Sequence, residues 1–322
     1  MRYLNTDNIK KIGIEWDQTI ETIRQAVTTL QQQDVAQPIK PYLRFRAPGN
    51  RIIAMPAFVG GDVNMAGIKW IASFPNNIQQ GIQRAHSVTI LNNADTGKPL
   101  AVLNTALMSG IRTASVTGLI IQKYDELYPL KDVTVGIIGF GPIGQLHLQM
   151  VTAILGDRIS KVLLYDIAGI KSDLFLEDMK DRTEVVESWE EAYRQADVFI
   201  TCTVSPSGYI DQKPKERSLL LNVSLRDFKP NILDYTQSII VDDWEEVCRE
   251  NTDIELMHLQ RGLQKSDTKS ITEVVCEDQM KAFPRNKPIL FNPMGMAIFD
   301  VAISTYYYRK ALENGVGTEL AD

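Results

Sequence analysis

The sequence predicts an α/β protein with two domains, one a Rossmann-type doubly wound parallel sheet and the other of α+β type. Three observations predict this fold. An apolar run at residues 133–138 leads directly into a glycine-rich turn, strand-like and helical segments alternate after Lys131, and several strand-like runs precede residue 105 without helices between them. Alternation implies parallel strands joined by right-handed crossovers, whereas strands without intervening helices favour an antiparallel or mixed sheet. A chain of 322 residues is long enough for both domains.

The N-terminal part begins with an amphipathic helix, predicted over residues 17–33. Apolar side chains recur there at helical spacing, with polar residues between them: Ile20, Ile23, Val27 and Leu30. Strands are then predicted at residues 51–56, 67–72, 87–91 and 99–103, followed by a long helix at 105–124. The turn residues 92–98 join the third strand to the fourth.

The second part begins with the strand at 133–138, and its helix starts after Pro142 and stops near Gly156. Ser188 and Glu191 form a capping box at the start of a short helix. Further strands are predicted at residues 161–166, 198–203, 219–223 and 238–241. The last helix, 297–313, ends at Asn314-Gly315 and is expected to return to the first domain. The predicted domains are therefore 1–118 joined by 301–322, and 119–300.

Gly139, Gly141 and Gly144 form a Gly-x-Gly-x-x-Gly turn between the first strand of the second part and its helix. In such a turn the first glycine lets the chain turn sharply, the second lets the backbone approach a pyrophosphate, and the third lets helix and strand pack closely. The helix then directs its free N–H groups and the positive end of its dipole at the phosphates. An ordinary tight βα turn is the alternative, but the strand before it and the helix after it favour a dinucleotide site.

Asp166 ends the next predicted strand of this unit. A carboxylate at that position accepts hydrogen bonds from an adenosine ribose and repels a 2′-phosphate. The alternative is a helix N-cap, because aspartate is also favoured there. The ribose role predicts NAD rather than NADP as the cofactor.

Composition excludes several other classes of function. The net charge is −6, and Lys and Arg are scattered without a basic stripe, so nucleic acid or an anionic membrane is not the expected partner. The three cysteines are widely spaced and form no metal-binding pattern, which predicts free thiols and no metal site. We find neither an N-terminal signal core nor a membrane-spanning apolar run. We therefore expect a cytoplasmic protein.

Three cations of the first domain lie among apolar or small residues: Arg44, Lys69 and Arg112. A cation in such a setting is costly unless an anion pairs with it. A solvated strand face for Lys69 and a structural salt bridge for each arginine are the alternatives. Taken together, the three residues favour a pocket for carboxylates, in which arginine binds two oxygens at once and lysine acts as a point charge or proton donor.

Asp227 follows the predicted strand at residues 219–223. Ligands of open α/β sheets bind beyond the carboxyl ends of the strands, so this carboxylate is placed for general acid–base chemistry beside a nicotinamide. A turn residue is an equally good interpretation of the position alone.

The chain resembles the ornithine cyclodeaminase/mu-crystallin family of NAD(P)-dependent enzymes. The resemblance spans essentially the whole chain and rests on the Arg44 segment and on residues 67–69, 111–114, 139–144, 222–227 and 292–300. It implies a homodimer whose first domain forms the subunit contact and holds the substrate. Arg44, Lys69 and Arg112 match the family's carboxylate-binding trio, and Asp227 matches its catalytic carboxylate, with Lys69 as a second proton-transfer residue. The cofactor contacts assigned on this basis are Thr113, Gly139, Gly141, Pro142, Ile143, Gly144, Asp166, Thr203, Ser224 and Met294.

Within the family, residues 35–44, 51–56, 67–71, 241–244 and 292–297 are most similar to the branch that makes 2,3-diaminopropionate for staphyloferrin B-type siderophores. That branch implies oxidation of N-(2-amino-2-carboxyethyl)-L-glutamate by NAD at the glutamyl α-carbon. Hydrolysis of the resulting imine would give 2,3-diaminopropionate and 2-oxoglutarate. A substrate with several carboxylates suits a site with several cations.

Two departures from the cyclodeaminase pattern do not favour ornithine as the substrate. Residues 225–230 read Leu-Arg-Asp-Phe-Lys-Pro where cyclodeaminases have Gly-Gly-Asp or Gly-Ala-Asp followed by Pro-Gly-Lys, and Pro293 replaces a serine of the C-terminal signature. The alternatives within the family are ornithine cyclodeamination, alanine dehydrogenation and ketimine reduction. A non-catalytic NAD(P)-binding protein similar to mu-crystallin is the alternative from another class.

Overall fold

A computed structural model describes residues 1–47 and 49–321 of the chain. The chain forms two compact units. The first unit comprises Met1–Arg112 and Gly295–Asp322, and the second comprises Thr113–Met294. The boundary at Arg112 lies inside helix α3 (Leu107–Leu127), whose uninterrupted helical pattern gives no local sign of it.

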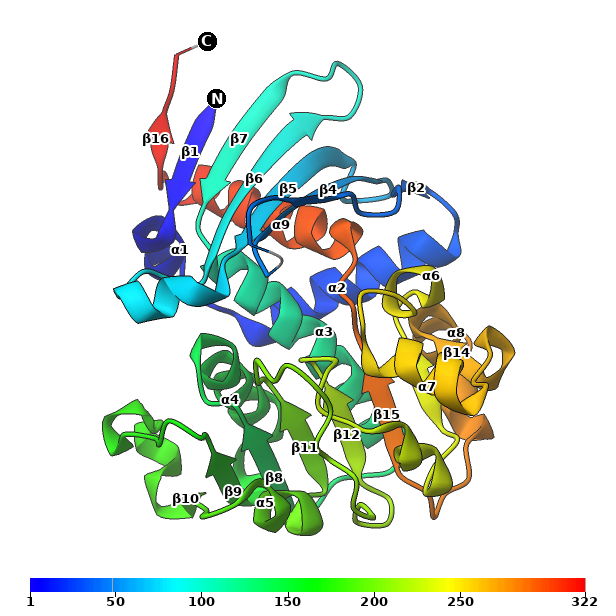
Figure 1. The fold of residues 1–322 in the computed structure, drawn as a ribbon. Helices are drawn as coiled ribbons and strands as arrows, with labels where there is room; N and C mark the ends of the chain where they lie inside the picture. Colours follow the sequence, from blue (N-terminus) through cyan, green and yellow to red (C-terminus); the bar gives the residue numbers. More distant parts are fainter. Residues whose placement is uncertain (48, 322) are drawn as a thin grey trace. The chain divides into compact units, whose positions relative to one another are not determined.

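The first unit is built on a mixed sheet of eight strands (Figure 1). Its order is β16-β1-β7-β6-β5-β4-β2, with β3 paired to β4. Neighbouring strands are antiparallel except for the parallel pair β1 and β7. The strands are β1 Arg2–Asn5, β2 Val35–Ala36, β3 Tyr42–Arg44, β4 Arg51–Val59, β5 Met65–Ser73, β6 Ala85–Asn93, β7 Pro99–Asn104 and β16 Thr318–Glu319. The four strands predicted in this region are confirmed as β4 to β7.

Helix α9 (Ala297–Glu313) packs against β4, β5 and β6 and against helix α2 (Trp16–Gln31), while α1 (Thr6–Ile12) packs beside α9. Because side chains alternate along a strand, Met65, Gly67 and Lys69 of β5 lie on the face toward α9. Residues 66, 68, 70 and 72 lie on the opposite face, and Trp70 there is 44% exposed. Lys69 therefore lies in the buried layer between the sheet and α9.

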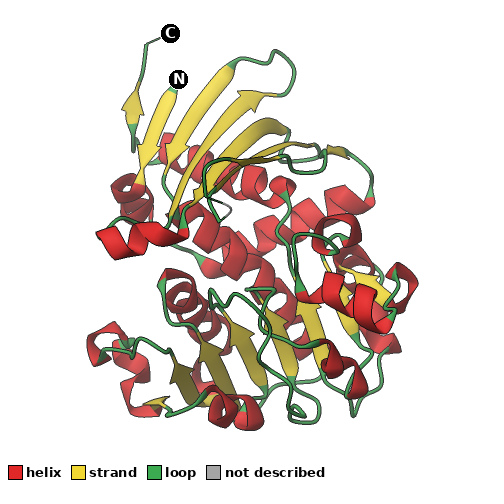
Figure 2. Cartoon of the chain, in the orientation of Figure 1, coloured by secondary structure: helices red, strands yellow, loops and turns green. Residues whose placement is uncertain are grey.

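The second unit is built on a parallel sheet of eight strands (Figure 2). The order β10-β9-β8-β11-β12-β15-β13-β14 confirms the predicted doubly wound arrangement. The chain runs outward from β8 to β10 and then returns to the other side of β8 with β11, so the strand order reverses between β8 and β11. The strands are β8 Val133–Ile138, β9 Ile159–Tyr165, β10 Thr183–Val185, β11 Val198–Thr201, β12 Leu219–Asn222, β13 Ile239–Val241, β14 Thr268–Ser270 and β15 Ile289–Asn292.

Helices connect the strands of the second unit, and Tyr193, Phe199 and Phe228 are among the large side chains buried between them. The helices are α4 Pro142–Leu155, α5 Trp189–Gln195, α6 Trp244–Val247, α7 Asp253–Arg261 and α8 Ile271–Cys276. Ser188 caps α5 by accepting the Glu191 N–H, which is one of the two bonds of the predicted capping box. Strand β11 ends at Thr201, two residues earlier than predicted, because Thr203 turns away to bond Asp227.

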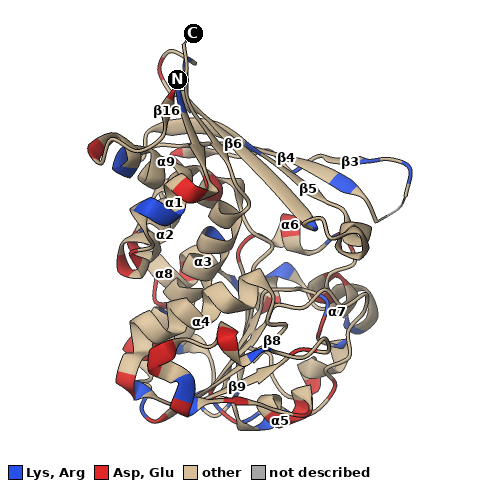
Figure 3. Ribbon diagram, turned by 90° about the vertical axis from the view of Figure 1, so that its left-hand side faces the viewer, with Lys and Arg blue, Asp and Glu red and all other residues tan. Residues whose placement is uncertain are grey.

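Charged side chains are distributed over both units, and Figure 3 shows Lys and Arg interspersed with Asp and Glu along the ribbon. Among the described residues, none of the helices has the length and apolar character needed to cross a bilayer.

Candidate active site

The glycine turn lies at the carboxyl end of β8, beside the point where the strand order of the sheet reverses. Gly139 has a φ of 83°, and a Cβ there would lie 2.5 Å from the carbonyl carbon of Cys202. A Cβ at Gly144 would lie 2.2 Å from the Gly139 oxygen, whereas one at Gly141 would meet nothing within 4 Å. The first and third glycines are therefore required by close packing, and the second faces open space at the N-terminus of α4. This geometry fits the pyrophosphate of a dinucleotide.

Asp166 directly follows β9, and its carboxylate bonds the glycine turn. Its Oδ2 accepts the Phe140 N–H at 2.7 Å, and its Oδ1 accepts the Ala168 N–H at 2.9 Å. The chain makes a turn at residues 166–169, closed by the Gly169 N–H on the Asp166 carbonyl, instead of starting a helix. The helix N-cap interpretation of Asp166 is therefore wrong, and its position next to the turn suits the ribose of the same dinucleotide.

The other residues predicted to contact a cofactor make internal contacts near these elements. Pro142 and Ile143 form the first turn of α4, and the Ile143 carbonyl lies 2.7 Å from Nδ1 of the buried His147. Thr113 accepts a bond from Thr117 through its carbonyl, and the Met294 N–H donates to Asp242. Their role toward a cofactor stays a prediction.

In the first unit, Lys69 and Arg112 meet on one carboxylate that the sequence analysis did not single out. Lys69 Nζ and Arg112 Nε each lie 2.9 Å from Asp300 Oδ1, and Lys69 Nζ also donates to Ser109 Oγ at 2.8 Å. Lys69, Arg112 and Asp300 are 2%, 7% and 4% exposed. The predicted solvated strand face for Lys69 is wrong, whereas the structural ion pair considered for Arg112 is present. Two cations share one anion, which leaves the cluster with a net positive charge.

Burial and neighbouring charges shift the pKa values of this cluster in opposite directions. Burial lowers the pKa of Lys69 to about 8; Asp300 opposes this change, and Arg112 and Lys40 add to it. Burial alone would raise the pKa of Asp300, but Arg112 and Lys69 outweigh it and hold that pKa below its usual range. Asp300 therefore stays ionised, and Lys69 can give up a proton near neutral pH.

Lys40 and Gly295 complete the surroundings of the cluster. Lys40 is 4% exposed, and its Nζ donates to the Gly295 carbonyl at 2.8 Å. Gly295 has a φ of 86°, and a Cβ at this residue would lie 2.4 Å from Nη1 of Arg112. Only glycine lets the chain pass this close to the guanidinium. Lys40 is thus a third buried cation, close enough to Lys69 to lower its pKa.

Arg44 lies apart from Lys69 and Arg112. It is exposed on β3, with its guanidinium carbon 5.3 Å from the centroid of the Tyr42 ring. Arg44 pairs with Arg51, and Lys69 pairs with Met55, so both cations lie on the same face of the sheet. Two strand spacings and four residue steps separate their backbones by roughly 15 Å. The structure brings together two members of the predicted trio and not the third.

Asp227 lies in the loop after β12 and is fully buried. It is therefore not a solvent-exposed turn residue. Its Oδ1 accepts the Thr203 hydroxyl at 2.5 Å, its Oδ2 accepts the Ser224 hydroxyl, and Tyr209 adds a third hydrogen bond. Burial raises the pKa of Asp227, while hydrogen bonds from the hydroxyls of Thr203, Thr201 and Tyr209 and the charge of Arg226 oppose the rise. The carboxyl group is therefore a better base than an exposed aspartate.

Comparison with known proteins assigns the chain to a family. The model of the ornithine cyclodeaminase/mu-crystallin family matches residues 7–315. The chain belongs to this family. The expected fold and family resemblance are therefore confirmed.

Two relatives are similar to the chain in sequence, and one solved structure is similar to it in fold. The chain is 33% identical to N-((2S)-2-amino-2-carboxyethyl)-L-glutamate dehydrogenase of Staphylococcus aureus, over 99% of this chain and 98% of that one. It is 27% identical to alanine dehydrogenase of Archaeoglobus fulgidus, over 95% and 94% of the two chains. The structure of Thermococcus litoralis Delta(1)-pyrroline-2-carboxylate reductase with NADH and L-proline has a TM-score of 0.86 at 24% identity, covering 99% and 100% of the chains.

Sequence reasoning about this family member missed Asp300, Lys40 and Asp253, the last a buried acid that contacts the Asp227 loop. One local signal was available for Asp300, which interrupts the apolar start of α9 as Lys69 interrupts β5. Pairing the two interruptions requires the fold, because Lys69 and Asp300 are 231 residues apart in the chain.

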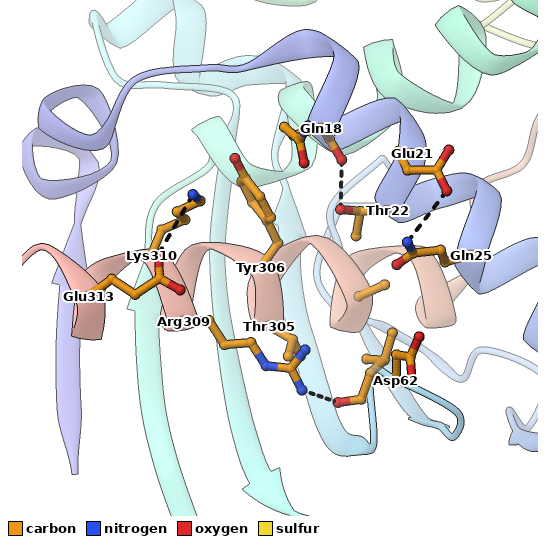
Figure 4. A pocket seen from close by; sticks show the side chains of 12 residues that line it. Gln18, Glu21, Thr22, Gln25, Asp62, Thr305, Tyr306, Arg309, Lys310 and Glu313 are labelled. Atoms are coloured by element: carbon orange, nitrogen blue, oxygen red, sulfur yellow. Dashed lines mark hydrogen bonds and ion pairs between the residues drawn. The ribbon is translucent and has the colours of Figure 1, made fainter.

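A surface hollow of about 200 Å³ in the first unit contains none of these residues (Figure 4). Gln18, Glu21, Thr22 and Gln25 of α2 and Arg309 and Lys310 of α9 line it. Arg309 donates to the Val63 carbonyl, so its charge supports the adjoining loop. The hollow offers no chemistry beyond that of an ordinary polar surface.

Proposed function

We propose that this chain is an NAD-dependent oxidoreductase that converts N-(2-amino-2-carboxyethyl)-L-glutamate to L-2,3-diaminopropionate and 2-oxoglutarate. One observation carries the proposal: the buried cluster of the first unit opposes Lys69 and Arg112 with the single carboxylate of Asp300. A net positive, desolvated cluster of this kind favours a ligand with carboxylates. The 33% identity to a dehydrogenase of this substrate, over 99% of the chain, supports the same assignment.

The reaction couples oxidation of a C–N bond to its hydrolysis. Bound NAD supplies the acceptor for a hydride from the glutamyl α-carbon, and the glycine turn and Asp166 are the residues that would hold it. The secondary amine loses that hydride and its N–H proton and becomes an imine. Water then adds to the imine carbon, and the C–N bond breaks to leave a carbonyl on 2-oxoglutarate and an amine on diaminopropionate. We assign Asp227 as the base for the amine and water protons, and Lys69 as the donor to the departing nitrogen.

The substrate's charges match the cations available on one face of the first sheet. The conjugate has three carboxylates, and Arg112 with Lys69 suits one of them. Arg44, on the same face, is placed for a more distant carboxylate of an extended substrate. Alanine or Δ1-pyrroline-2-carboxylate has a single carboxylate and leaves Arg44 without a role.

The subunit assembly we propose is a homodimer formed through the first unit. The face of its sheet opposite α9 carries apolar side chains that remain partly exposed, among them Pro56, Ile68, Trp70, Val88 and Ile90. Pro56, Ile68 and Ile90 are directly paired across β4, β5 and β6 and form one continuous stripe. Self-pairing of such a face gives a closed twofold interface. We place the dimer in the cytoplasm, where its three free cysteines stay reduced, as a source of diaminopropionate for a siderophore or antibiotic.

Product analysis tests the function directly. The purified protein is incubated with NAD and the synthetic conjugate, and mass spectrometry is expected to find diaminopropionate, 2-oxoglutarate and NADH in equal amounts. Parallel reactions contain ornithine with NAD, alanine with NAD, and Δ1-pyrroline-2-carboxylate with NADH. Faster formation of proline or pyruvate in one of these would assign that family activity instead. NAD binding without turnover of any of them would favour a non-catalytic binder.

Two variants test the assigned roles in the same assay. Asp227→Asn is expected to lower kcat by roughly 10²–10⁴-fold while NAD affinity is retained, because the base is lost and the nucleotide site is not. Arg112→Ala is expected to raise KM by roughly 10–100-fold, through loss of a charge-assisted carboxylate contact. Lys10→Ala, at an exposed residue of α1, is the matched control. An Asp227→Asn enzyme that turns over at the parental rate would contradict the role of Asp227.

A further inference from the structure

A second buried carboxyl group lies directly against the loop that carries Asp227. Asp253, the first residue of α7, is fully buried. Its Oδ2 accepts the backbone N–H groups of Asp227 at 3.0 Å and Phe228 at 2.9 Å, and the Asn222 side-chain amide at 2.9 Å. Its own N–H donates to the Leu225 carbonyl. Asp253 therefore fixes both ends of the four-residue loop from 225 to 228.

The two oxygens of Asp253 have different surroundings. All three donors converge on Oδ2, whereas Oδ1 is buried and has no hydrogen-bond partner among the described residues. An unpaired oxygen costs far more on a buried anion than on a neutral acid. The arrangement thus favours a proton on Oδ1, with Oδ2 as the accepting carbonyl oxygen.

A chain of polar side chains joins Asp253 to the Asp227 carboxylate. The Asn222 amide donates to Asp253, and its oxygen accepts the Thr201 hydroxyl at 3.2 Å. Thr201 Oγ1 lies 2.7 Å from Ser224 Oγ, where either hydroxyl can be the donor, and Ser224 Oγ also contacts Asp227 Oδ2. The side chains of Asn222, Thr201 and Ser224 thus hold the two acids in one network, in which the charge on either acid is felt by the other.

The charged and titratable groups around the pair are few. Arg226 lies in the same loop and lowers the pKa of Asp227, although its guanidinium donates to the Glu250 carbonyl. Tyr209 faces Asp227, and Cys202 lies near enough that Asp227 raises the pKa of its thiol. Burial raises the pKa of Asp253 to about 7; its hydrogen bonds oppose the rise and the Asp227 charge adds to it. Two acids and one partly buried arginine, whose guanidinium bonds the Glu250 carbonyl, leave the pair short of positive charge.

We propose that Asp253 is a positioning residue for Asp227 and that the two buried carboxyl groups hold one proton between them at neutral pH. Asp253 fixes the loop backbone through Oδ2, and its proton lets Asp227 carry the single negative charge. The catalytic part of this inference rests on the proposed function. Such a pair titrates as one unit, so removal of one member changes the pKa of the other.

Thermal unfolding tests the shared proton without any substrate. Wild type, Asp253→Asn, Asp227→Asn and the double variant are unfolded at pH 5 to 8.5. The native pKa values of both acids are raised, so the native state binds more protons than the unfolded chain and stability falls as pH rises from about 4 through about 7. The Tm of Asp253→Asn relative to wild type should therefore increase across this range and then level off. Asn suits the site because its oxygen can accept the same three bonds, with its amide at the position of Oδ1.

The double variant and an exposed control complete the unfolding experiment. Each variant loses part of the pH dependence of Tm seen in wild type. The loss in the double variant should be smaller than the sum of the losses in Asp253→Asn and Asp227→Asn, because each acid raises the pKa of the other. Asp173→Asn, which changes an exposed carboxyl group of the same unit, should follow wild type at every pH. A Tm difference between Asp253→Asn and wild type that stays constant with pH would overturn the proposal.

Turnover tests the positioning role. For NADH formation, kcat/KM of wild type should change as Asp253 ionises near pH 7, and this change should be absent in Asp253→Asn, whereas the acidic limb should stay in place because the neutral amide replaces a protonated acid. A purely structural role would lower kcat/KM equally at all pH values, and that result would overturn positioning. Coupled unfolding profiles in a protein that does not turn over the conjugate would support the shared proton and contradict the proposed substrate.

Discussion

At the residue scale, two buried cations of the first unit share one oxygen, Asp300 Oδ1. Lys69 and Arg112 both donate to it, and burial lowers the pKa of Lys69 to about 8. If protonated Lys69 donates to the departing nitrogen, kcat/KM for the conjugate should fall as pH rises through about 8. Asp300→Asn removes the charge that raises the pKa of Lys69, so the basic limb should move to lower pH, by about one unit.

Steady-state rates from pH 6 to 10 check this prediction. Asp95→Asn, in the exposed turn between β6 and β7, removes an acid of the same unit without approaching Lys69 and should leave the profile in place. A basic limb that Asp300→Asn does not move would show that Lys69 is not the group titrating there.

Local sequence context identified the cations but not their anion. Lys69 and Arg112 were predicted to form a site because each lies in an apolar or small-residue setting, which makes an isolated charge costly. Asp300 has the same kind of setting on α9. The cost of its burial is offset by Arg112 and Lys69, which lie 188 and 231 positions away in the chain. Arg44 shows the opposite case: its flanking residues resemble those of Lys69, yet it is exposed on the short strand β3, which pairs with β4.

At the scale of elements, the glycines of the turn have two different roles: Gly141 leaves open space for a ligand, and Gly144 allows close packing. The sequence motif does not distinguish these roles. A Cβ at Gly141 would enter open space, so Gly141→Ala should leave Tm unchanged and weaken NAD binding, by roughly tenfold or more, because the methyl group occupies the approach of the phosphate. A Cβ at Gly144 would lie 2.2 Å from the Gly139 oxygen, so Gly144→Ala should lower stability by about 1–3 kcal/mol.

The two alanine variants are matched controls for each other. Calorimetric titration with NAD and thermal unfolding of both would separate the effects. If Gly141→Ala binds NAD as tightly as wild type, the open space beside Gly141 does not receive the phosphates.

Elements with a strong periodic pattern were predictable, and short edge elements were not. Helix α9 has the predicted bounds because its apolar run ends at Asn314-Gly315, which stops a helix. The strands β4 to β7 were recognisable from their local sequence alone. Strands β2, β3 and β16 have two or three residues each and are defined only by their pairing with a neighbour. Their existence depends on tertiary contacts rather than on local preference.

At the scale of the whole molecule, each sheet has a distinct role that its topology explains. The parallel sheet reverses its strand order beside the glycine turn, which is where open α/β sheets bind ligands. The mixed sheet has one face covered by α9 and an apolar stripe on the other. Family membership accounts for both sheets, whereas the substrate is set by a few side chains on them.

The apolar stripe makes the proposed dimer testable. Ile68 lies at its centre, paired with Pro56 on one side and Ile90 on the other. In a twofold interface a single substitution occurs twice, so Ile68→Glu would bury two unpaired carboxylates and should convert a dimer of about 72 kDa (twice 36.2 kDa) to monomers.

Light scattering coupled to gel filtration measures the masses. Leu259→Glu, at an exposed leucine of α7 in the second unit, controls for the change in polarity and should leave the dimer intact. An Ile68→Glu protein that remains dimeric would place the subunit contact elsewhere, and a wild-type monomer would rule the dimer out. In either case the partly exposed stripe would need another occupant.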